Sequence, residues 1–525
     1  MQDSKHATYD TGLADQPGPY LHQRASDRVM WWPWGEAAFE AAQDANKPIL
    51  LSIGYSACPW CAKMADESFR DSDIAAAVNQ NYVAIVVDRE QRPDLNAQYQ
   101  SAAQGLGLAG GWPLTLFCTP DGLPFWGGTF FPAGDQDGQS GFLTVLNHIA
   151  EGYRARLDDV RNNAASIKDH MAQFQTRLQP GTLNPQLVDK VAVSYMARMD
   201  LQHGGITGAP KFPNVPYFER LWRAYLRTGR ADFAAAIQLT FSRMCQGGFY
   251  DHIGGGFARY SLDGEWHEPQ QEKLLTDNAL LLASMCHIHG NIPQALYAQR
   301  IAHTADFLLH DMRTQEGAFC ASIGATEGFY QWQKSDVMTA LGDALGQRFC
   351  QIYAVEENDI PSRHGSADFG DAEAEAPLLA ACEKLRQIRD MRPAPQRDDQ
   401  VLADANGFAI CAITAAAKLM QRPDWLEQAK RAYAAVLSAN RCDGLLYHSP
   451  PNTKTSAKTN AISTVDDYAS LGLAGIALAC AEDNPEMLDF VRTLADDMLS
   501  QFQSSSGIFL QSADDPLAPL SAAPR

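Results

Sequence analysis

The sequence lacks a long apolar run, an apolar N-terminal leader and any excess of positive charge. Its longest nearly uncharged apolar stretch, about residues 469–481, is too short to cross a bilayer, and the N-terminus shows no secretory signal. Lysine and arginine total 42 against 62 acidic residues, a net charge of −20, which argues against binding to a phosphate backbone. We therefore expect a cytoplasmic, soluble protein with no nucleic-acid and no membrane partner.

The sequence also lacks the dense, even-numbered cysteines of a secreted disulfide framework. Its 11 cysteines are mostly isolated in segments with a helical pattern, and nine are interpreted as small buried apolar residues. The exceptions are Cys58 and Cys61. What the chain does contain is 46% hydrophobic residues in a length of 525, enough to bury large cores.

The first part of the chain alternates between strand-like and helix-like patterns. Short apolar, β-branched runs predict strands, and longer runs with little glycine or proline predict helices. The predicted strands are 49–54, 82–88, 114–118 and 125–131, the last antiparallel to its neighbour, and the predicted helices are 63–78, with a break near Asp71, and about 150–178.

Cys58-Pro59-Trp60-Cys61 stands between the first predicted strand and the first predicted helix, which is a thioredoxin-like signature. The first cysteine of such a pair lies where free backbone N–H groups favour a thiolate, and the spacing lets the second close a disulfide. We therefore predict that Cys58 is the more exposed, attacking thiol and that Cys61 is the sheltered, resolving one. Pro113, which opens a later strand after Trp112, is predicted to be cis and to pack against the thiols.

Three other interpretations stay open at this point. The two cysteines could be half of a zinc site, although no second cysteine pair follows nearby. They could be packing residues of an inert scaffold, and Trp112-Pro113 could be an ordinary trans turn. We expect no metal and no cofactor.

Several longer motifs lie along the chain, at residues 32–39, 47–56, 88–94, 110–115, 127–132, 209–213, 254–260, 272–273 and 277–279. These motifs resemble those of the spermatogenesis-associated thioredoxin-like proteins and their bacterial YyaL-type relatives. The resemblance covers most of the chain and implies a thioredoxin-like domain followed by a six-hairpin toroid resembling sugar epimerases and glycosidases. Two departures stand out: Pro59 and Ala62 replace the histidines of the family's C-H-W-C-H, and Gln270-Gln271 replaces a His-Phe pair.

A repeat of about 63 residues runs through the rest of the chain and fits one helical hairpin per unit. Glycine followed by an aromatic or apolar residue recurs, and Asp277-Asn278, Asp404 and Asp466 each open an Ala/Leu-rich helix, where they are expected as N-caps. Six such units would close into an all-α (α/α)6 toroid; an open solenoid is the alternative. The predicted organisation is a flexible N-terminus (1–18), an α/β thioredoxin-like domain (19–178) and the toroid (185–515).

The loop-rich end of a toroid is where a pocket would form, and carboxylates with aromatic rings suit sugar chemistry. We expect the five carboxylates of Asp251, Glu272, Asp277, Asp404 and Asp466 to gather there. The alternatives are that each aspartate merely caps a helix, that the histidine is satisfied within its loop, and that the aromatic rings belong to the core. The candidate pocket residues are Asp251, His252, Arg259, Tyr260, Trp266, Glu272, Asp277, Asp404, Asp466 and Asp467.

The leading functional hypothesis is a thiol–disulfide oxidoreductase domain fused to a carbohydrate-enzyme-like toroid. Its partner would be a redox partner protein or a small carbohydrate-like ligand. The first alternative is a carbohydrate-active enzyme, epimerase or glycosidase-like, with a structural thioredoxin-like domain. The second is a non-catalytic interaction protein that reuses both folds, since a fold alone does not decide a function.

Overall fold

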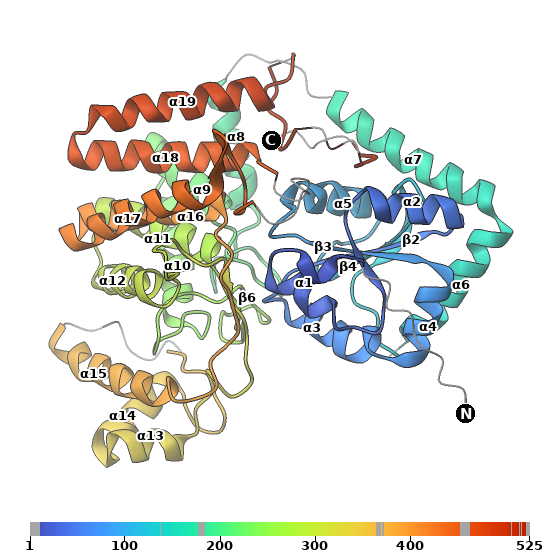
Figure 1. Ribbon diagram of the computed structural model, residues 1–525. Helices are drawn as coiled ribbons and strands as arrows, with labels where there is room; N and C mark the ends of the chain where they lie inside the picture. Colours follow the sequence, from blue (N-terminus) through green and yellow to red (C-terminus); the bar gives the residue numbers. More distant parts are fainter. Residues whose placement is uncertain are drawn as a thin grey trace. The chain divides into compact units, whose positions relative to one another are not determined.

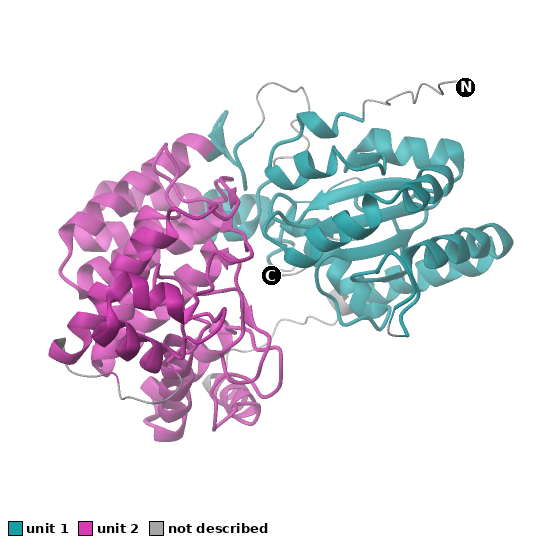
Figure 2. Ribbon diagram, turned by 90° about the horizontal axis from the view of Figure 1, so that it is seen from below, with its two compact units in different colours: residues 1–180, 440–469, 495–525 teal, residues 181–439, 470–494 magenta. Residues whose placement is uncertain are grey.

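The computed structural model describes residues 11–136, 138–176, 184–363, 369, 372–451, 462–505, 507–513, 515 and 517–520. These residues form two compact units (Figure 2), each continuous in space but not in sequence. Unit 1 consists of residues 1–180, 440–469 and 495–525, and unit 2 consists of residues 181–439 and 470–494. This grouping differs from the predicted toroid range of 185–515, because two late segments belong with the N-terminal domain.

A five-stranded sheet with helices on both faces forms the core of unit 1 (Figure 1). The strand order is β1-β3-β2-β4-β5; β1, β3 and β2 are parallel, whereas β4 and β5 are antiparallel to their neighbours. Every residue of β2, β3 and β4 is buried, as expected for apolar strands covered on both faces. The strands are β1 (Trp31–Pro33), β2 (Ile49–Gly54), β3 (Val83–Asp88), β4 (Leu114–Cys118) and β5 (Pro124–Gly128).

The four predicted strands correspond to β2, β3, β4 and β5, although β5 ends at Gly128 and β1 was not predicted. The predicted break in the first long helix is found. A π-helical turn, η2 (Ala65–Phe69), follows α3 (Pro59–Met64), and Asp71 caps the next helix by accepting hydrogen bonds from two backbone N–H groups. The other helical elements of this region are η1 (Leu13–Asp15), α1 (Pro19–Arg24), α2 (Glu36–Ala45), α4 (Ser72–Asn81), α5 (Pro93–Gly105), α6 (Phe142–Ala155) and α7 (Leu157–Thr176).

Late segments of the chain complete unit 1. Thr464 forms an isolated β-bridge with Ser512, and the buried guanidinium of Arg92 is held between Asp94 and Asp515. A short hairpin of β11 (Arg441–Cys442) and β12 (Leu445–Leu446) also lies in this unit. Contacts so distant in sequence explain why the domain boundary could not be drawn from a composition change.

Unit 2 is built from helical hairpins, so the predicted order of an α/β domain followed by a helical region is confirmed. Helices α11 and α16 are buried on nearly all faces and pack along each other, which makes them inner helices. The helices are α8 (Pro185–Met196), α9 (Val215–Thr228), α10 (Ala231–Gln246), α11 (Leu275–Asn291), α12 (Ala295–His310), α16 (Ala403–Leu419), α17 (Pro423–Asn440), α18 (Val465–Glu482) and α19 (Pro485–Phe502). The start of α18 and the end of α19 are assigned to unit 1.

Residues 330–390 depart from the hairpin pattern. Helices α13 (Lys334–Leu341), α14 (Asp343–Tyr353) and α15 (Ala372–Arg389) gather around a core of their own, with Phe349 and Leu385 fully buried in it. Because α11 packs directly against α16, these three helices do not separate them. The short strands of unit 2 are β6 (Tyr260–Ser261), β7 (Pro269–Gln270), β8 (Lys273–Leu274), β9 (Ser322–Ile323) and β10 (Arg397–Asp398).

Two buried asparagines clamp the glycine-aromatic loops to the inner helices. The Asn278 side chain accepts the Phe257 N–H (2.7 Å) and donates to the Phe257 carbonyl (3.0 Å), and Asn406 holds Phe319 in the same way (2.9 and 3.0 Å). Each amide also donates to the carbonyl four residues earlier in its own helix. The glycine-aromatic loops at these two positions of the sequence repeat therefore have the same structure, in which an asparagine of an inner helix holds the loop.

Substituting Asn278 with alanine should lower the free energy of unfolding by about 2–4 kcal/mol, because a buried N–H and a buried carbonyl lose their partners. Urea denaturation monitored by far-UV circular dichroism measures this. The matched control is Asn291→Ala, whose exposed amide also bonds to the carbonyl four residues earlier, and its effect should stay within about 0.5 kcal/mol. Equal effects of the two substitutions would contradict the clamp.

Candidate functional site

The two cysteines of the motif lie at the junction between β2 and α3. Cys58 is the N-cap residue of α3, and its sulfur accepts the backbone N–H of Cys61 at 3.1 Å. Pro59 occupies the first helical position, where no N–H is needed, so the turn is fixed without loss of a hydrogen bond. Both cysteines are free thiols. The Sγ of Cys58 thus receives a backbone donor, which is the local arrangement that favours a thiolate.

The expected difference in exposure between the two thiols is not found. Cys58 and Cys61 are each 3% exposed. Trp60, between them in sequence, is 42% exposed instead; its ring makes an edge contact with Phe130, and the Lys63 ammonium lies 5.3 Å from its centroid. The reason is local, since a cysteine at an N-cap turns its side chain back over the first helical turn. Of the nine other cysteines, predicted to be buried, six are buried, Cys411 and Cys442 are partly exposed and Cys480 is exposed.

The Trp112–Pro113 peptide bond is cis, as predicted. Leu114, the next residue, pairs with Ile53 in the antiparallel β2–β4 register, so Pro113 stands level with the end of β2. The thiols follow directly after that end. The same register thus brings the cis-proline loop and the C-x-x-C turn to one edge of the sheet.

An arginine joins these two loops. The Arg89 guanidinium carbon lies 3.5 Å from the Tyr55 ring centroid and 4.1 Å from that of Trp112, within cation–π range of both rings. The Arg89 backbone N–H donates to the Gly54 carbonyl at 2.9 Å. A cation stacked on two aromatic rings therefore braces the loop before the cysteines against the loop before Pro113.

In unit 2, the carboxylate of Asp251 is fully engaged by buried cations. Its oxygens lie 2.7 Å from Lys273 Nζ and 2.8 Å from Arg389 Nη1, and they also accept the backbone N–H groups of Ile253 and Gly254. Burial alone would raise the pKa of the Asp251 carboxyl, but Arg389 and Lys273 hold it well below its usual range. A carboxylate held in this way is a poor general acid.

The same turn occurs a second time in the chain. Asp200 pairs with Lys211 at 2.7 Å, as Asp251 pairs with Lys273, and each lysine also donates to a turn carbonyl at 2.6 Å, that of Gly204 or Gly255. Hydrogen bonds from Lys211 and the turn N–H groups lower the pKa of Asp200 to about 2, against the effect of burial. Because the arrangement is repeated, its first role is to build the turn.

His252 is satisfied within its loop, as the alternative interpretation held. Its Nε2 lies 3.1 and 3.0 Å from two backbone carbonyls, and its Nδ1 accepts from Arg300 Nη2 at 3.1 Å. Burial and the Arg300 charge lower the pKa of His252 well below 6.5, so the ring is neutral near pH 7. A neutral ring with both nitrogens engaged has no free position for proton transfer.

A small cavity of about 20 Å³, room for about one water molecule, adjoins these residues. Among the predicted residues, Asp251 and His252 line it, together with Lys273 and Tyr330. The other four carboxylates expected to gather with Asp251 are not among the lining residues.

The remaining candidates in unit 2 take part in local packing. Arg259 forms an ion pair with Asp277 at 2.7 Å, and Tyr260 stacks on Phe212 with centroids 4.8 Å apart. Trp266 is fully buried and donates its ring N–H to the His203 carbonyl. Glu272 is 1% exposed and precedes β8.

The aspartates at the helix starts are not N-cap residues, contrary to the expectation. Leu274 and Leu402 occupy those positions, and Asp277 and Asp404 lie inside the first turns of α11 and α16. The leucine side chain has no oxygen that could cap the helix. A buried extended strand or loop precedes both helix starts. The acidic side chains in the first turn still interact favourably with the helix dipole.

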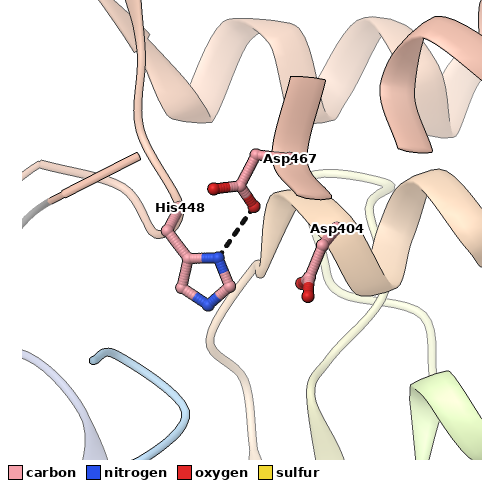
Figure 3. Close-up of side chains that lie close together, drawn as sticks. All are labelled: Asp404, His448 and Asp467. Atoms are coloured by element: carbon pink, nitrogen blue, oxygen red, sulfur yellow. Dashed lines mark hydrogen bonds and ion pairs between the residues drawn. The ribbon is translucent and has the colours of Figure 1, made fainter. Parts of the chain in front are cut away.

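Asp466 and Asp467 lie in the first turn of α18, and Asp467 forms a capping box with Thr464. Its carboxylate accepts the Thr464 N–H at 2.7 Å and the Thr464 hydroxyl at 2.9 Å, and the hydroxyl accepts the Asp467 N–H at 3.3 Å. Figure 3 shows the ring of His448, not predicted from the sequence, pointing its Nδ1 at the other Asp467 oxygen, 2.8 Å away. The second ring nitrogen lies 2.8 Å from the Glu90 carbonyl.

The chain is similar to several known proteins. Residues 10–172 match the family Thioredox_DsbH, described as a protein of unknown function, DUF255. An uncharacterized protein of Caenorhabditis elegans is 32% identical over 81% of this chain, and spermatogenesis-associated protein 20 of rat and of human is 28% identical over 94%. The chain is therefore similar to the spermatogenesis-associated thioredoxin-like proteins over most of its length. It spans 64% of the length of the nematode relative and 70% of that of the rat and human proteins.

Two solved structures show a low similarity to the chain. The chain is similar to D-mannose isomerase (11% identity, TM-score 0.41, covering 64% of this chain and 76% of that one) and to an unsaturated glucuronyl hydrolase specific for heparin (9% identity, TM-score 0.39, covering 71% and 78%). None of the helices in the described residues is long and apolar enough to span a membrane.

Three residues of unit 1 were not predicted from the sequence: Tyr20 beside Gly54, Arg89 on the Tyr55 ring, and His448 on the Glu90 carbonyl. Tyr20 lies far upstream of the motif in a short helix, and His448 comes from a segment that follows the helical region. Only Arg89 could have been found from the sequence, because it lies in the 88–94 motif directly after a predicted strand. The other two are brought to the domain by tertiary contacts.

Replacing Asp251 with asparagine should destabilise the protein by about 3–5 kcal/mol at neutral pH, because two buried cations lose their counter-charge. The matched substitution Asp200→Asn should cost less, since the Asp200 side chain is 17% exposed against 9% for Asp251. Thermal or urea unfolding compares the two variants. An Asp251→Asn variant with the same free energy of unfolding as the wild type would show that these ion pairs do not stabilise the fold.

Acidification should separate the same variant from the wild type. The pKa of Asp251 is depressed in the folded state, so its contribution is complete above the unfolded pKa of about 3.9 and is lost as the pH falls below it. Between about pH 5 and pH 3 the wild type should therefore lose more unfolding free energy than Asp251→Asn. Parallel pH profiles would contradict this assignment.

Proposed function

We propose that this chain is a thiol–disulfide oxidoreductase in which Cys58 attacks, Cys61 resolves and Pro113 borders the reacting sulfurs. The observation that carries the proposal is the Cys61 N–H donated to Cys58 Sγ at 3.1 Å, at the start of a helix that follows a central strand. That hydrogen bond stabilises a thiolate on Cys58 without the histidines found beside the motif in relatives. The cis-proline loop at the same sheet edge supports the assignment.

The reaction follows ordinary thiol–disulfide exchange. The Cys58 thiolate attacks one sulfur of a substrate disulfide, a mixed disulfide forms, and the other substrate sulfur leaves as a thiolate. The Cys61 sulfur then attacks Cys58 Sγ, the mixed disulfide breaks, and the second substrate sulfur leaves, taking up the Cys61 proton. The substrate gains two electrons, the protein is left with a Cys58–Cys61 disulfide, and a small dithiol donor restores the reduced pair.

The surface beside the sulfurs suits a peptide substrate. Trp60 and Phe130 present an aromatic pair next to the motif, with the Lys63 ammonium within 5.4 Å of both ring centroids. Aromatic rings and a long amphipathic side chain give contact area to an apolar segment without a deep cleft. A disulfide carried on an exposed chain segment fits this surface better than one buried in a folded core.

A carbohydrate-active function has weaker support. The Asp251 carboxylate is neutralised by Lys273 and Arg389, and His252 has both ring nitrogens engaged. A glycosidase needs two carboxyl groups facing one bond, one of them able to release a proton. The cavity of about 20 Å³ offers Asp251 alone among the predicted carboxylates.

Cysteine substitutions test the oxidoreductase. The wild type with a dithiol donor should reduce insulin disulfides at least about tenfold faster than the donor alone, and Cys58→Ser should fall to the background rate because the attacking sulfur is gone. Cys61→Ser should accumulate a mixed disulfide through Cys58, visible by mass spectrometry. Cys480→Ser, which removes the exposed cysteine, is the control and should match the wild type. Activity retained by Cys58→Ser would refute the proposal.

A further inference from the structure

A tyrosine hydroxyl and the sulfur of the resolving cysteine both lie beside Gly54. Tyr20, on α1, is 2% exposed. A Cβ built on Gly54 would lie 2.3 Å from the Tyr20 Oη and 2.8 Å from the Cys61 Sγ. The oxygen and the sulfur therefore converge on one point beside the bare Cα of Gly54, at the end of the central strand.

The helix that carries Tyr20 is fixed to the rest of the domain. The Gln91 side chain donates to the Pro17 carbonyl just before α1, and the Arg24 guanidinium lies 5.7 Å from the Tyr20 ring centroid. Arg24 is itself buried and pairs with Asp27 at 3.3 Å. The hydroxyl is thus held in place by a helix outside the sheet, independently of the C-x-x-C turn.

A hydroxyl in this position acts as a donor. Burial, and after it the charge of the neighbouring Cys61 thiolate, raises the pKa of Tyr20 well above 10. The phenol therefore keeps its proton at any pH at which the thiols react. A neutral O–H beside a sulfur that must become a thiolate can stabilise it by a charge-assisted hydrogen bond.

We propose that the Tyr20 hydroxyl donates a hydrogen bond to the Cys61 sulfur as that sulfur takes on negative charge, and so accelerates resolution of the mixed disulfide. The inference rests on the proposed oxidoreductase function. In this step the Cys61 sulfur loses its proton to the departing substrate thiolate, bonds to Cys58 Sγ and breaks the mixed disulfide. Tyr20 keeps its own proton throughout.

The two sulfurs are then served by different groups. Cys58 receives a backbone N–H from the first turn of α3, whereas Cys61 receives a side-chain donor from α1. Loss of the Tyr20 hydroxyl should affect the second chemical step and leave the first unchanged. A residue that merely packs would, when altered, change both steps or the stability.

A small aromatic disulfide that releases a coloured thiolate, 5,5′-dithiobis(2-nitrobenzoate), resolves the two steps in a stopped-flow experiment. The full chain carries Cys480→Ser to remove the exposed cysteine, and the reduced protein is in excess over the reagent. The first coloured thiolate reports attack by Cys58, and the second reports resolution by Cys61. Tyr20→Phe should slow the second phase about tenfold and change the first by less than about twofold, the effect of one hydrogen bond to a charged group.

The matched control is Tyr99→Phe, which removes another buried hydroxyl of unit 1, one that donates to the Gly122 carbonyl at 2.9 Å. Its two phases should match those of the parent. An unchanged second phase in Tyr20→Phe, or equal slowing of both phases, overturns the role of Tyr20 while the oxidoreductase stands. Absence of the first phase from the parent protein, with no mixed disulfide trapped in Cys61→Ser, removes the proposed function itself.

Discussion

The absence of a side chain at Gly54 is the constraint on which the thiol site depends. This residue ends β2, the central strand of the sheet, where it pairs with Asp88 of β3 and accepts the Arg89 N–H. A methyl group here would meet Tyr20 and Cys61 at distances far below van der Waals contact. Only glycine lets a helix from before the sheet, the C-x-x-C turn and the loop after β3 meet at one place. The missing side chain at Gly54 thus determines which groups can lie beside the Cys61 sulfur.

In the helical region, charge and amide groups are used to shape loops. The Asp200–Lys211 and Asp251–Lys273 pairs close two turns of the same form, each with two successive glycines at positive φ. Asn278 and Asn406 then fasten the following loops to the inner helices. A residue pattern that suggested a catalytic cluster is therefore accounted for by repeated construction of one motif, and this weakens the inference from acidic residues to sugar chemistry.

The sequence predicted the sheet well because its strands are apolar runs between clear turn signals, and because a C-x-x-C after a strand fixes what precedes and follows it. Prediction of the helical region erred by one residue. Helices α11 and α16 begin at Leu275 and Ala403, so Asn278 matches Asn406, whereas the sequence argument matched Asp277 with Asp404. Aspartate and asparagine are both typical of helix starts in a sequence. Only the structure shows that the asparagine amide donates to a loop carbonyl, as a clamp does, and does not cap its own helix. Tyr20 escaped prediction because nothing local marks a buried hydroxyl.

The end of the chain bears on the thiol site through a short series of contacts within unit 1. His448 reaches the carbonyl of Glu90, and Glu90 follows Arg89, the cation stacked between Tyr55 and Trp112. Arg92, in the same loop, is held by Asp515. His448 and Asp515 therefore support the loop that braces the cis-proline turn against the C-x-x-C turn. A fragment that ends at the first predicted boundary would keep both cysteines and lose these supports, which argues that the segments carrying His448 and Asp515 are part of the thioredoxin-like domain itself.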